Sequence, residues 1–189
     1  FEIIKNYKKP FVFASSQMSN MSYSPYGILK NLGERYTYLL GGIVVKFWNV
    51  YGIERDLSKS HVITDFILKA LKTRKISMLT NGEEKRDFLY AEDCCEGLLK
   101  IFLKYKKIKK KLSVDLTSGK YTKIIDIAKI IKKILSEKKI QTKIRPSKNT
   151  DLVQLDKKNK PDLYFKKFWK PKFSLESGIR EIINFYDKR

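Results

Sequence analysis

The feature that most constrains this chain is the alternation of short apolar runs with longer stretches of helical spacing. The runs PFVFASS (10–16) and GIVVKFWNVYG (42–52) are apolar and partly β-branched, as buried strands are. Between them, residues 25–40 have helical spacing, with Ser24 as the predicted cap and two glycines at 41–42 as the stop. Strands that alternate with helices predict an α/β fold with a parallel sheet.

The alternation continues through the rest of the chain. It predicts further strands over 76–82, 85–90, 112–119 and 140–146. It predicts further helices over 61–75, 91–105, 122–139, 161–167 and 174–186, after the end of a first helix at 2–9. The Lys- and Asn-rich stretch 147–160 is the predicted loop.

Length and composition bound what the chain can be. Its 189 residues, 42% of them hydrophobic, fit one globular domain or one and a half. No apolar run reaches membrane-spanning length, and the first residues given, FEIIKNYKKP, lack the pattern of a signal peptide, so we expect a soluble, cytoplasmic protein. The adjacent Cys94 and Cys95 argue against a disulfide framework or a zinc cluster, and we expect no metal. Because the first residue is Phe1, we expect the chain to begin partway through a longer protein.

The formal net charge of +21 would attract nucleic acid, acidic membranes or anionic small molecules. Lysine is spread along the whole chain, however, and the densest run, KYKKIKKK (104–111), is typical of a solvated helix end. We therefore expect no membrane partner and do not favour a dedicated nucleic-acid surface.

One short motif, SPYGILK (24–30), has a tyrosine and a lysine four residues apart. With 11 Tyr and 34 Lys in the chain, chance alone predicts about two such pairs. Two occur, Tyr26 with Lys30 and Tyr105 with Lys109. The spacing alone therefore decides nothing, and the surroundings of each pair must be compared.

The surroundings favour the first pair. Ser15 and Ser16 come at the carboxyl end of a predicted parallel strand, where open α/β sheets bind ligands. Tyr26 and Lys30 then follow on one face of the next helix. A nearby ammonium favours the phenolate, which lets a tyrosine act as an acid/base near neutral pH, while a serine hydroxyl can hydrogen-bond the same substrate oxygen. The set suits hydride chemistry at a secondary alcohol or ketone.

Five stretches, in their order and spacing, carry a resemblance to a known family: FVFASS, SPYGILK, VVKFWNVYG, HVITDFI and KRDFLYAEDCCEGL. Together they resemble the extended short-chain dehydrogenase/reductase superfamily and, more narrowly, the NAD-dependent epimerase/dehydratase family acting on nucleotide sugars. The tail WKPKFSLESGIREIINFY is similar to that family's last helix, so the resemblance covers essentially the whole chain.

The resemblance implies a partial Rossmann-like parallel sheet plus a smaller α/β substrate-binding domain. Residues 1–52 would be the remnant of an NAD-binding Rossmann domain that holds the Ser, Tyr and Lys site. Residues 53–189 would be mainly the nucleotide-sugar domain, with 88–118 returning to the Rossmann sheet. The cofactor would be NAD, with NADP as the open alternative. The substrate would be a nucleotide-diphosphate sugar and the assembly a homodimer.

The resemblance also implies catalytic and cofactor roles. Tyr26 would be the catalytic acid/base, and Lys30 would bind the nicotinamide ribose and tune Tyr26. Ser16 would hydrogen-bond the reacting sugar hydroxyl, or else only cap a turn. Trp48 lies on the segment that would pass the nicotinamide, although a tryptophan there could equally belong to the core.

Substrate contacts follow from the same resemblance. Asn49 would touch the sugar or diphosphate, or be a turn residue after the strand. His61 and Val62 would approach the nucleotide, or simply begin a helix. Arg86 would pair with the diphosphate through its forked guanidinium, or form a surface ion pair. Asp93 would cap or orient the helix after RDFLY.

Two departures from the family narrow the expectation. Sugar 4,6-dehydratases, and the decarboxylases that resemble them, carry an acid just after the catalytic Ser or Thr, where this chain has Gln17 and Met18. Neither side chain can supply a proton, which leaves oxidation and reduction at one carbon: a 4-epimerase or a ketosugar reductase.

The second departure is that no glycine-rich, pyrophosphate-binding turn precedes FVFASS. We therefore expect the chain to be inactive alone. The alternative is a noncatalytic basic fragment that binds anionic ligands or nucleic acid. The sugar, the nucleotide base and the oligomeric state are left open.

Overall fold

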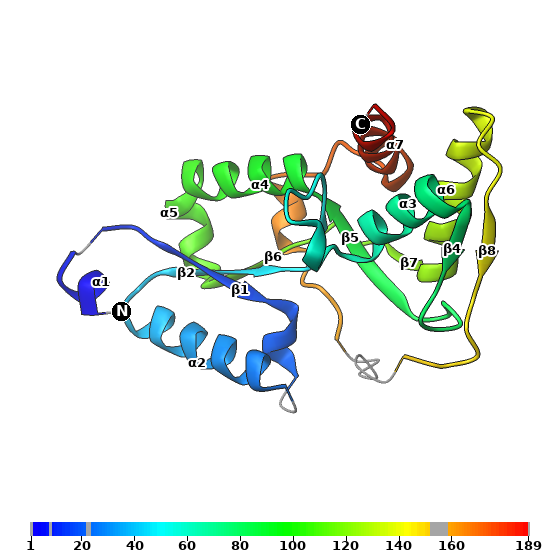
Figure 1. Cartoon of the computed structure of the whole chain (residues 1–189). Coiled ribbons are helices and arrows are strands. Elements are labelled where there is room, and N and C mark those ends of the chain that lie inside the picture. Colours follow the sequence, from blue (N-terminus) through cyan, green and yellow to red (C-terminus); the bar gives the residue numbers. More distant parts are fainter. Residues whose placement is uncertain (1, 8, 22–23, 152–158, 189) are drawn as a thin grey trace. The chain divides into compact units, whose positions relative to one another are not determined.

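The computed structural model describes residues 2–7, 9–21, 24–151 and 159–188. It divides into two compact units, each assembled from three stretches of the chain (Figure 1). Unit 1 comprises the described residues of Phe1–Trp48, Cys94–Gly119 and Asp156–Lys170, and unit 2 those of Asn49–Asp93, Lys120–Leu155 and Pro171–Arg189.

Unit 1 contains a parallel sheet and the helices around it. Its elements are α1 (Glu2–Tyr7), β1 (Val12–Ser16), the 3-10 helix η1 (Gln17–Asn20), α2 (Pro25–Leu39), β2 (Ile43–Phe47), most of α4 (Ala91–Leu103), α5 (Tyr105–Ile108), η3 (Lys109–Lys111), β6 (Ser113–Leu116) and η4 (Tyr164–Lys167). The sheet has the strand order β1-β2-β6, with both pairings parallel.

Register across this sheet aligns a polar row near the carboxyl ends of the strands. Ser15 of β1 is the register partner of Lys46 in β2, and Lys46 is that of Asp115 in β6. Because side chains alternate along a strand, register partners share one face of the sheet. The three polar side chains therefore point to the same side.

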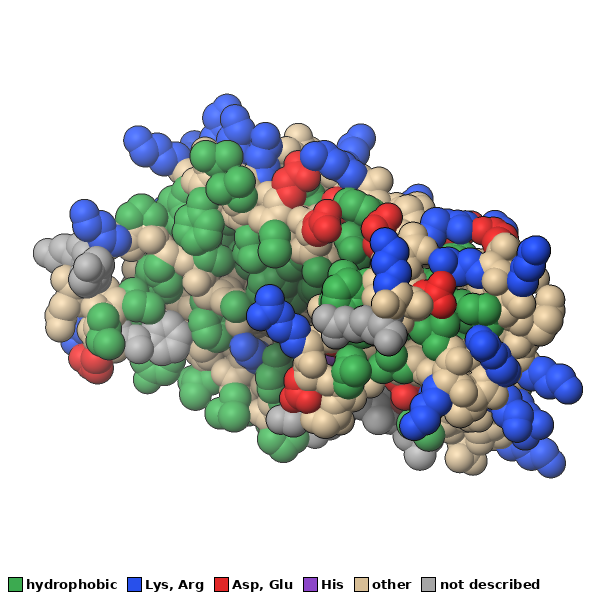
Figure 2. Space-filling view, turned by 45° about the horizontal axis from the view of Figure 1, so that its top comes forward, with side chains coloured by type: hydrophobic (Ala, Val, Ile, Leu, Met, Phe, Trp, Pro, Cys, Tyr) green, Lys and Arg blue, Asp and Glu red, His purple; other side chains and the backbone are tan. Residues whose placement is uncertain are grey.

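Helix α2 lies close against β1. A Cβ at Gly33 would come 2.3 Å from the ring of Phe13, so only a glycine allows the helix to approach so closely. The opposite side of α2 exposes large apolar side chains: Ile28, Leu29, Leu32, Tyr36 and Leu39. Hydrophobic side chains are also visible among the exposed ones in Figure 2.

Unit 2 combines two small sheets with three long helices. Its elements are β3 (Asn49–Tyr51), η2 (Leu57–Lys59), α3 (Val62–Thr73), β4 (Lys75–Ser77), β5 (Lys85–Tyr90), β7 (Tyr121–Lys123), α6 (Ile124–Glu137), β8 (Lys143–Arg145) and α7 (Leu175–Asp187). Strand β5 pairs in parallel with β3 and antiparallel with β7, and β4 pairs in parallel with β8.

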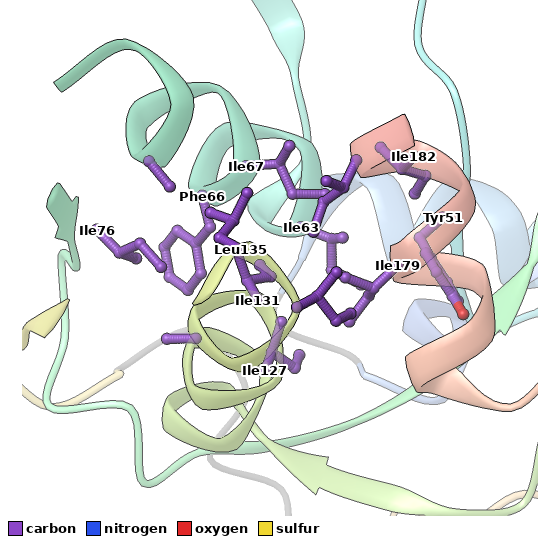
Figure 3. Packing of buried hydrophobic residues seen from close by; sticks show 14 of the residues in the cluster. Tyr51, Ile63, Phe66, Ile67, Ile76, Ile127, Ile131, Leu135, Ile179 and Ile182 are labelled. Atoms are coloured by element: carbon purple, nitrogen blue, oxygen red, sulfur yellow. The ribbon is translucent and has the colours of Figure 1, made fainter. Parts of the chain in front are cut away.

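The core of unit 2 is a continuous apolar cluster (Figure 3). Residues Ile127 and Ile131 of α6 recur at helical spacing and are fully buried, facing Ile63 and Ile67 of α3 and Ile179 of α7. This apolar periodicity is why the three segments form helices, since each becomes stable only when its apolar stripe is covered.

The α/β fold class and the partial Rossmann-like parallel sheet are confirmed. The predicted strand 42–52 is in fact two strands, β2 and β3, which belong to different sheets because β2 pairs with β6 whereas β3 pairs with β5. The antiparallel strand β7 is not among the predicted strands. Of the predicted loop, residues 152–158 lie outside the described residues.

The functional division into a nucleotide-binding remnant, residues 1–52, and a substrate domain, residues 53–189, stays a prediction. Within the described ranges, no helix is both long and apolar enough to cross a lipid bilayer. Nor do three His, Cys, Asp or Glu side chains there group as a metal ion would require.

Candidate active site

The site begins where β1 ends. The Ser16 hydroxyl accepts a hydrogen bond from the N–H of Met18 at 3.2 Å and so caps η1. The Ser24 hydroxyl accepts one from the N–H of Gly27 at 3.3 Å and caps α2. Both ends of the connection are thus held by serine caps, and α2 begins close to the carboxyl end of the strand.

Tyr26 and Lys30 lie together on α2. The Nζ atom of Lys30 is 5.5 Å from the centre of the Tyr26 ring and 5.4 Å from that of Phe13. It donates a hydrogen bond to the carbonyl oxygen of Ala14, two residues before Ser16, at 2.8 Å. The Tyr26 side chain is accessible, with 54% of the residue exposed. An ammonium therefore lies beside an accessible phenol at the end of a parallel strand.

The other pair at this spacing has a different setting. The Tyr105 hydroxyl lies 3.4 Å from the carbonyl oxygen of Phe11 and 3.3 Å from that of Gly41 and donates to both. Its phenol therefore ties α5 to the loops that flank β1 and β2. This is a structural position, and the choice of Tyr26 over Tyr105 as the catalytic tyrosine stays a prediction.

A buried polar group beside Ser15 was missed by sequence reasoning. Glu34, one turn after Lys30, is only 4% exposed. Its carboxylate accepts a hydrogen bond from the Ser15 hydroxyl at 2.5 Å and pairs with Lys46 Nζ at 3.2 Å. The available signal was Lys46 itself, a charged residue inside the apolar run IVVKF.

Asp115 adds a second buried carboxyl at the same edge of the sheet. Burial raises the pKa of Asp115 to about 6, against the opposing effects of the Asp162 N–H, which donates at 2.6 Å, and the Lys46 ammonium. Trp48, just beyond the end of β2, is 5% exposed, and its indole N–H lowers the pKa of Asp115 slightly against the effect of burial.

Unit 2 holds the predicted substrate residues. Asn49 donates its side-chain N–H to the carbonyl oxygen of Asp87 at 2.9 Å, and its register partner in β5 is Phe88. Arg86, one position before Asp87, forms an ion pair with Asp151. Asn49 and Arg86 thus lie on neighbouring strands.

The start of α3 carries the other two candidates. His61 is the residue before α3, and its ring Nδ1 lies 2.5 Å from Glu54 Oε1 with 75% of the side chain exposed. Val62 is the first residue of the helix and packs against the apolar core of unit 2. These positions leave the predicted roles of both residues open to test.

Asp93 has a role that differs from a helix cap. Its two carboxylate oxygens accept hydrogen bonds from the backbone N–H groups of Lys172 and Phe173, each at 2.9 Å. The side chain therefore holds the segment that leads into α7.

Comparisons with known proteins place this geometry in context. The sequence model of the NAD dependent epimerase/dehydratase family matches residues 7–116. A Methanocaldococcus jannaschii protein with the provisional name UDP-glucose 4-epimerase is 30% identical over 170 residues, which cover 86% of this chain and 53% of that protein. UDP-glucuronic acid decarboxylase 1 of Xenopus tropicalis is 23% identical, over 77% of this chain and 33% of that enzyme.

The fold recurs in the Bordetella bronchiseptica enzyme WbmF, solved in complex with NAD+ and UDP. It superposes with a TM-score of 0.76 at 22% identity, over 99% of this chain and 62% of WbmF. The chain thus spans about half the length of the first curated relative and a third of the second.

Proposed function

The chain belongs to the NAD-dependent epimerase/dehydratase family, and on that premise we propose that it carries the acid/base site of a nucleotide-sugar 4-epimerase or ketosugar reductase. The observation that carries this proposal is the accessible phenol of Tyr26 beside the Lys30 ammonium at the end of β1. The reaction would move a hydride and a proton at one carbon of the sugar.

The residues around Lys30 fit the nicotinamide ribose of NAD. An ammonium has three N–H donors, so the bond to the Ala14 carbonyl leaves donors for ribose hydroxyls. Trp48 is proposed to lie beside the nicotinamide. Bound NAD would supply the hydride acceptor and donor, and NADP is the alternative that the described residues do not distinguish.

The chain's own residues carry out the proton transfer. In the oxidation direction, the Tyr26 phenolate takes the proton from the sugar hydroxyl while the Lys30 ammonium stabilises the phenolate. The Ser16 hydroxyl donates a hydrogen bond to the same sugar oxygen. In an epimerase the ketosugar then rotates in the site so that the hydride returns to its opposite face, and Tyr26 returns the proton to the oxygen. In a reductase only the return step occurs.

The surroundings of Gln17 support a single-carbon reaction. Gln17 is buried, and its side-chain oxygen accepts a hydrogen bond from Asn159 at 3.2 Å. An amide has no proton to give, so this position lacks the extra acid that elimination of water requires. This favours an epimerase or reductase over a dehydratase.

Recognition of the diphosphate is proposed for Arg86, whose forked guanidinium matches phosphate oxygens. Asn49, His61 and Val62 are proposed to contact the sugar or nucleotide from unit 2. Among the described residues, the side chains assigned to chemistry and those assigned to substrate binding come from different stretches of the chain.

We also propose that the protein is a homodimer through α2. In that helix Leu29 is 67% exposed and Leu39 82% exposed, and large exposed apolar side chains of this kind are typical of a face that another protein chain covers. Sedimentation of the variant Leu29→Glu should show a shift to monomer. A parent protein that is already monomeric at micromolar concentration would rule out this assembly.

The experiment that tests the catalytic proposal uses the longest natural polypeptide that contains this sequence and, beside it, the 189-residue chain, which we expect to be inactive alone. With NAD and a panel of UDP-sugars, an epimerase interconverts the 4-epimers without net NADH, whereas a reductase consumes NADH with a 4-ketosugar. Tyr26→Phe should lower kcat by about 10²- to 10⁴-fold.

Tyr105→Phe is the matched control, because it removes the hydroxyl of the other tyrosine at this spacing and should leave kcat unchanged. Activity within twofold of the parent in Tyr26→Phe would overturn the assigned role. Binding of RNA with steep salt dependence, together with inactivity toward every nucleotide sugar, would favour the noncatalytic alternative. Figure 2 shows basic side chains in several parts of the visible face with acidic ones among them, which does not point to one nucleic-acid patch.

A further inference from the structure

The polar row at the carboxyl end of the unit 1 sheet takes no direct part in the reaction proposed above. It consists of Ser15, Lys46 and Asp115, which are register partners across the three strands. Lys46 interrupts a strand that is otherwise apolar, and its side chain is only 14% exposed. A lysine in such a place requires partners, since a buried ammonium without them is costly.

The first partner is the carboxylate of Glu34 on α2. It lies 3.2 Å from Lys46 Nζ and also accepts the hydrogen bond from the Ser15 hydroxyl. Replacing a buried ion pair by apolar side chains of similar volume is often neutral or stabilising. Stability alone therefore does not account for this pair.

The second partner leads to the segment that follows Ser16. Lys46 Nζ donates to Asn20 Oδ1 at 2.7 Å, and the Asn20 amide donates to Asn159 Oδ1 at 2.9 Å. The Asn159 amide in turn donates to the carbonyl oxygen of Gln17 at 3.3 Å. The chain is thus held on both sides of Ser16, by Glu34 before it and by Lys46 and Asn159 after it.

The same helix face that holds this segment also presents the phenol. Tyr26, Lys30 and Glu34 follow one another at intervals of four residues, which places them along one ridge of α2. Lys30 binds the carbonyl of Ala14, and Glu34 binds the side chain of Ser15. Helix α2 therefore grips β1 at two successive residues immediately before Ser16.

We propose that Glu34 and Lys46 are positioning residues, whose buried ion pair fixes Ser16 relative to Tyr26. The inference rests on the proposed function, in which the side chains of Ser16 and Tyr26 meet the same substrate oxygen. A serine and a tyrosine on separate elements can share one oxygen only if their spacing is fixed, because misplacement by about 1 Å can cost a hundredfold in rate.

The test is ¹⁵N relaxation of the 189-residue chain without ligand. The apolar double variant Glu34→Met/Lys46→Met should unfold at a urea concentration equal to or above that of the parent. The amide order parameters of residues 16–19 should nevertheless fall from about 0.85 to below about 0.6. Those of Val44 and Val45 in β2 should stay unchanged. Lys46→Arg keeps the charge and should keep the segment rigid.

Unchanged order parameters at 16–19 in the double variant would overturn the proposal. So would an equal fall in β2, because that result would mean that the pair only stabilises the sheet. If the double variant does not fold, Glu34→Gln carries the test, since it removes the charge that pairs with Lys46 while the amide oxygen can still accept from Ser15, and it should loosen the same segment. No substrate is used, so this result is independent of the Tyr26→Phe assay that decides the proposed function.

Discussion

Gly178 of α7 lies directly against Tyr51 of β3: a Cβ at position 178 would come 2.2 Å from the phenol oxygen. The same Cβ would be 2.9 Å from a ring carbon of Tyr90. The packing of α7 onto β3 and β5 therefore depends on the absence of a side chain at this position.

Gly178→Ala should consequently destabilise the protein by about 1–3 kcal/mol, because overpacking outweighs the higher helix propensity of alanine. Urea unfolding measures the difference. In a Tyr51→Phe background the penalty should shrink, since the closest atom is gone, and this coupling identifies the contact. An alanine that stabilises the parent would show that α7 can shift.

Asp93→Asn should destabilise unit 2. The buried carboxylate accepts two backbone hydrogen bonds, and an amide would turn its NH2 toward one of the two N–H donors. Loss of a charge-assisted bond costs about 1.5–3 kcal/mol. Asp65→Asn breaks a half-buried ion pair with Lys69 one turn along α3 instead and should cost less, about 0.5 kcal/mol. Equal effects of the two substitutions in urea unfolding would refute the role of Asp93.

Asp115 should make stability depend on pH. Burial raises the pKa of Asp115 from 3.8 to about 6, so the folded chain holds this proton more tightly than the unfolded chain. The stabilising contribution is fully present below about pH 4 and is lost as the pH rises through 6. Its size is roughly 3 kcal/mol, from about 1.4 kcal/mol per pH unit.

The variant Asp115→Asn cannot titrate at this position. Its free energy of unfolding, relative to the parent, should therefore increase between pH 4 and pH 7, as urea unfolding at both values would show. A difference between parent and variant that is the same at both pH values would contradict the assignment.

Asp151→Asn should strengthen binding of UDP, if Arg86 binds the diphosphate as proposed. The carboxylate of Asp151 forms an ion pair with the Arg86 guanidinium, and a bound diphosphate would have to displace that carboxylate. Removing this competing carboxylate should therefore raise the affinity for UDP. Calorimetric titration with UDP measures this, and Arg86→Met should abolish binding. Weaker binding in Asp151→Asn would show instead that Asp151 contacts the nucleotide itself.

Much of the fold follows from local sequence pattern. Helices α3, α6 and α7 were predicted because each carries an apolar stripe at helical spacing, which is a property of a short stretch alone. The division of 42–52 into β2 and β3 could not be predicted, because it depends on which distant strand each half pairs with. Strand β7 is three residues long and polar, so its sequence has no alternating apolar pattern.

The candidate site likewise contains residues that local sequence spacing predicts and residues that it does not. Tyr26 and Lys30 were found because four residues along a helix bring two side chains onto one face. Glu34 and Lys46 meet across two elements, and no periodicity relates them. Arg86 and Asp151 are 65 residues apart, and their pairing exists only once β5 and the stretch after β8 have folded.

The interleaving of the two units has a consequence for synthesis on the ribosome. Strand β2 ends at Phe47, but its partner β6 begins only at Ser113, and the whole first stretch of unit 2, Asn49–Asp93, lies between them. At cellular rates of elongation, residues 48–112 take on the order of 3–13 seconds to emerge. During that interval the backbone edge of β2 that pairs with β6 has no partner. The nascent chain is therefore available to chaperones, and slower translation of residues 48–112 lengthens that time.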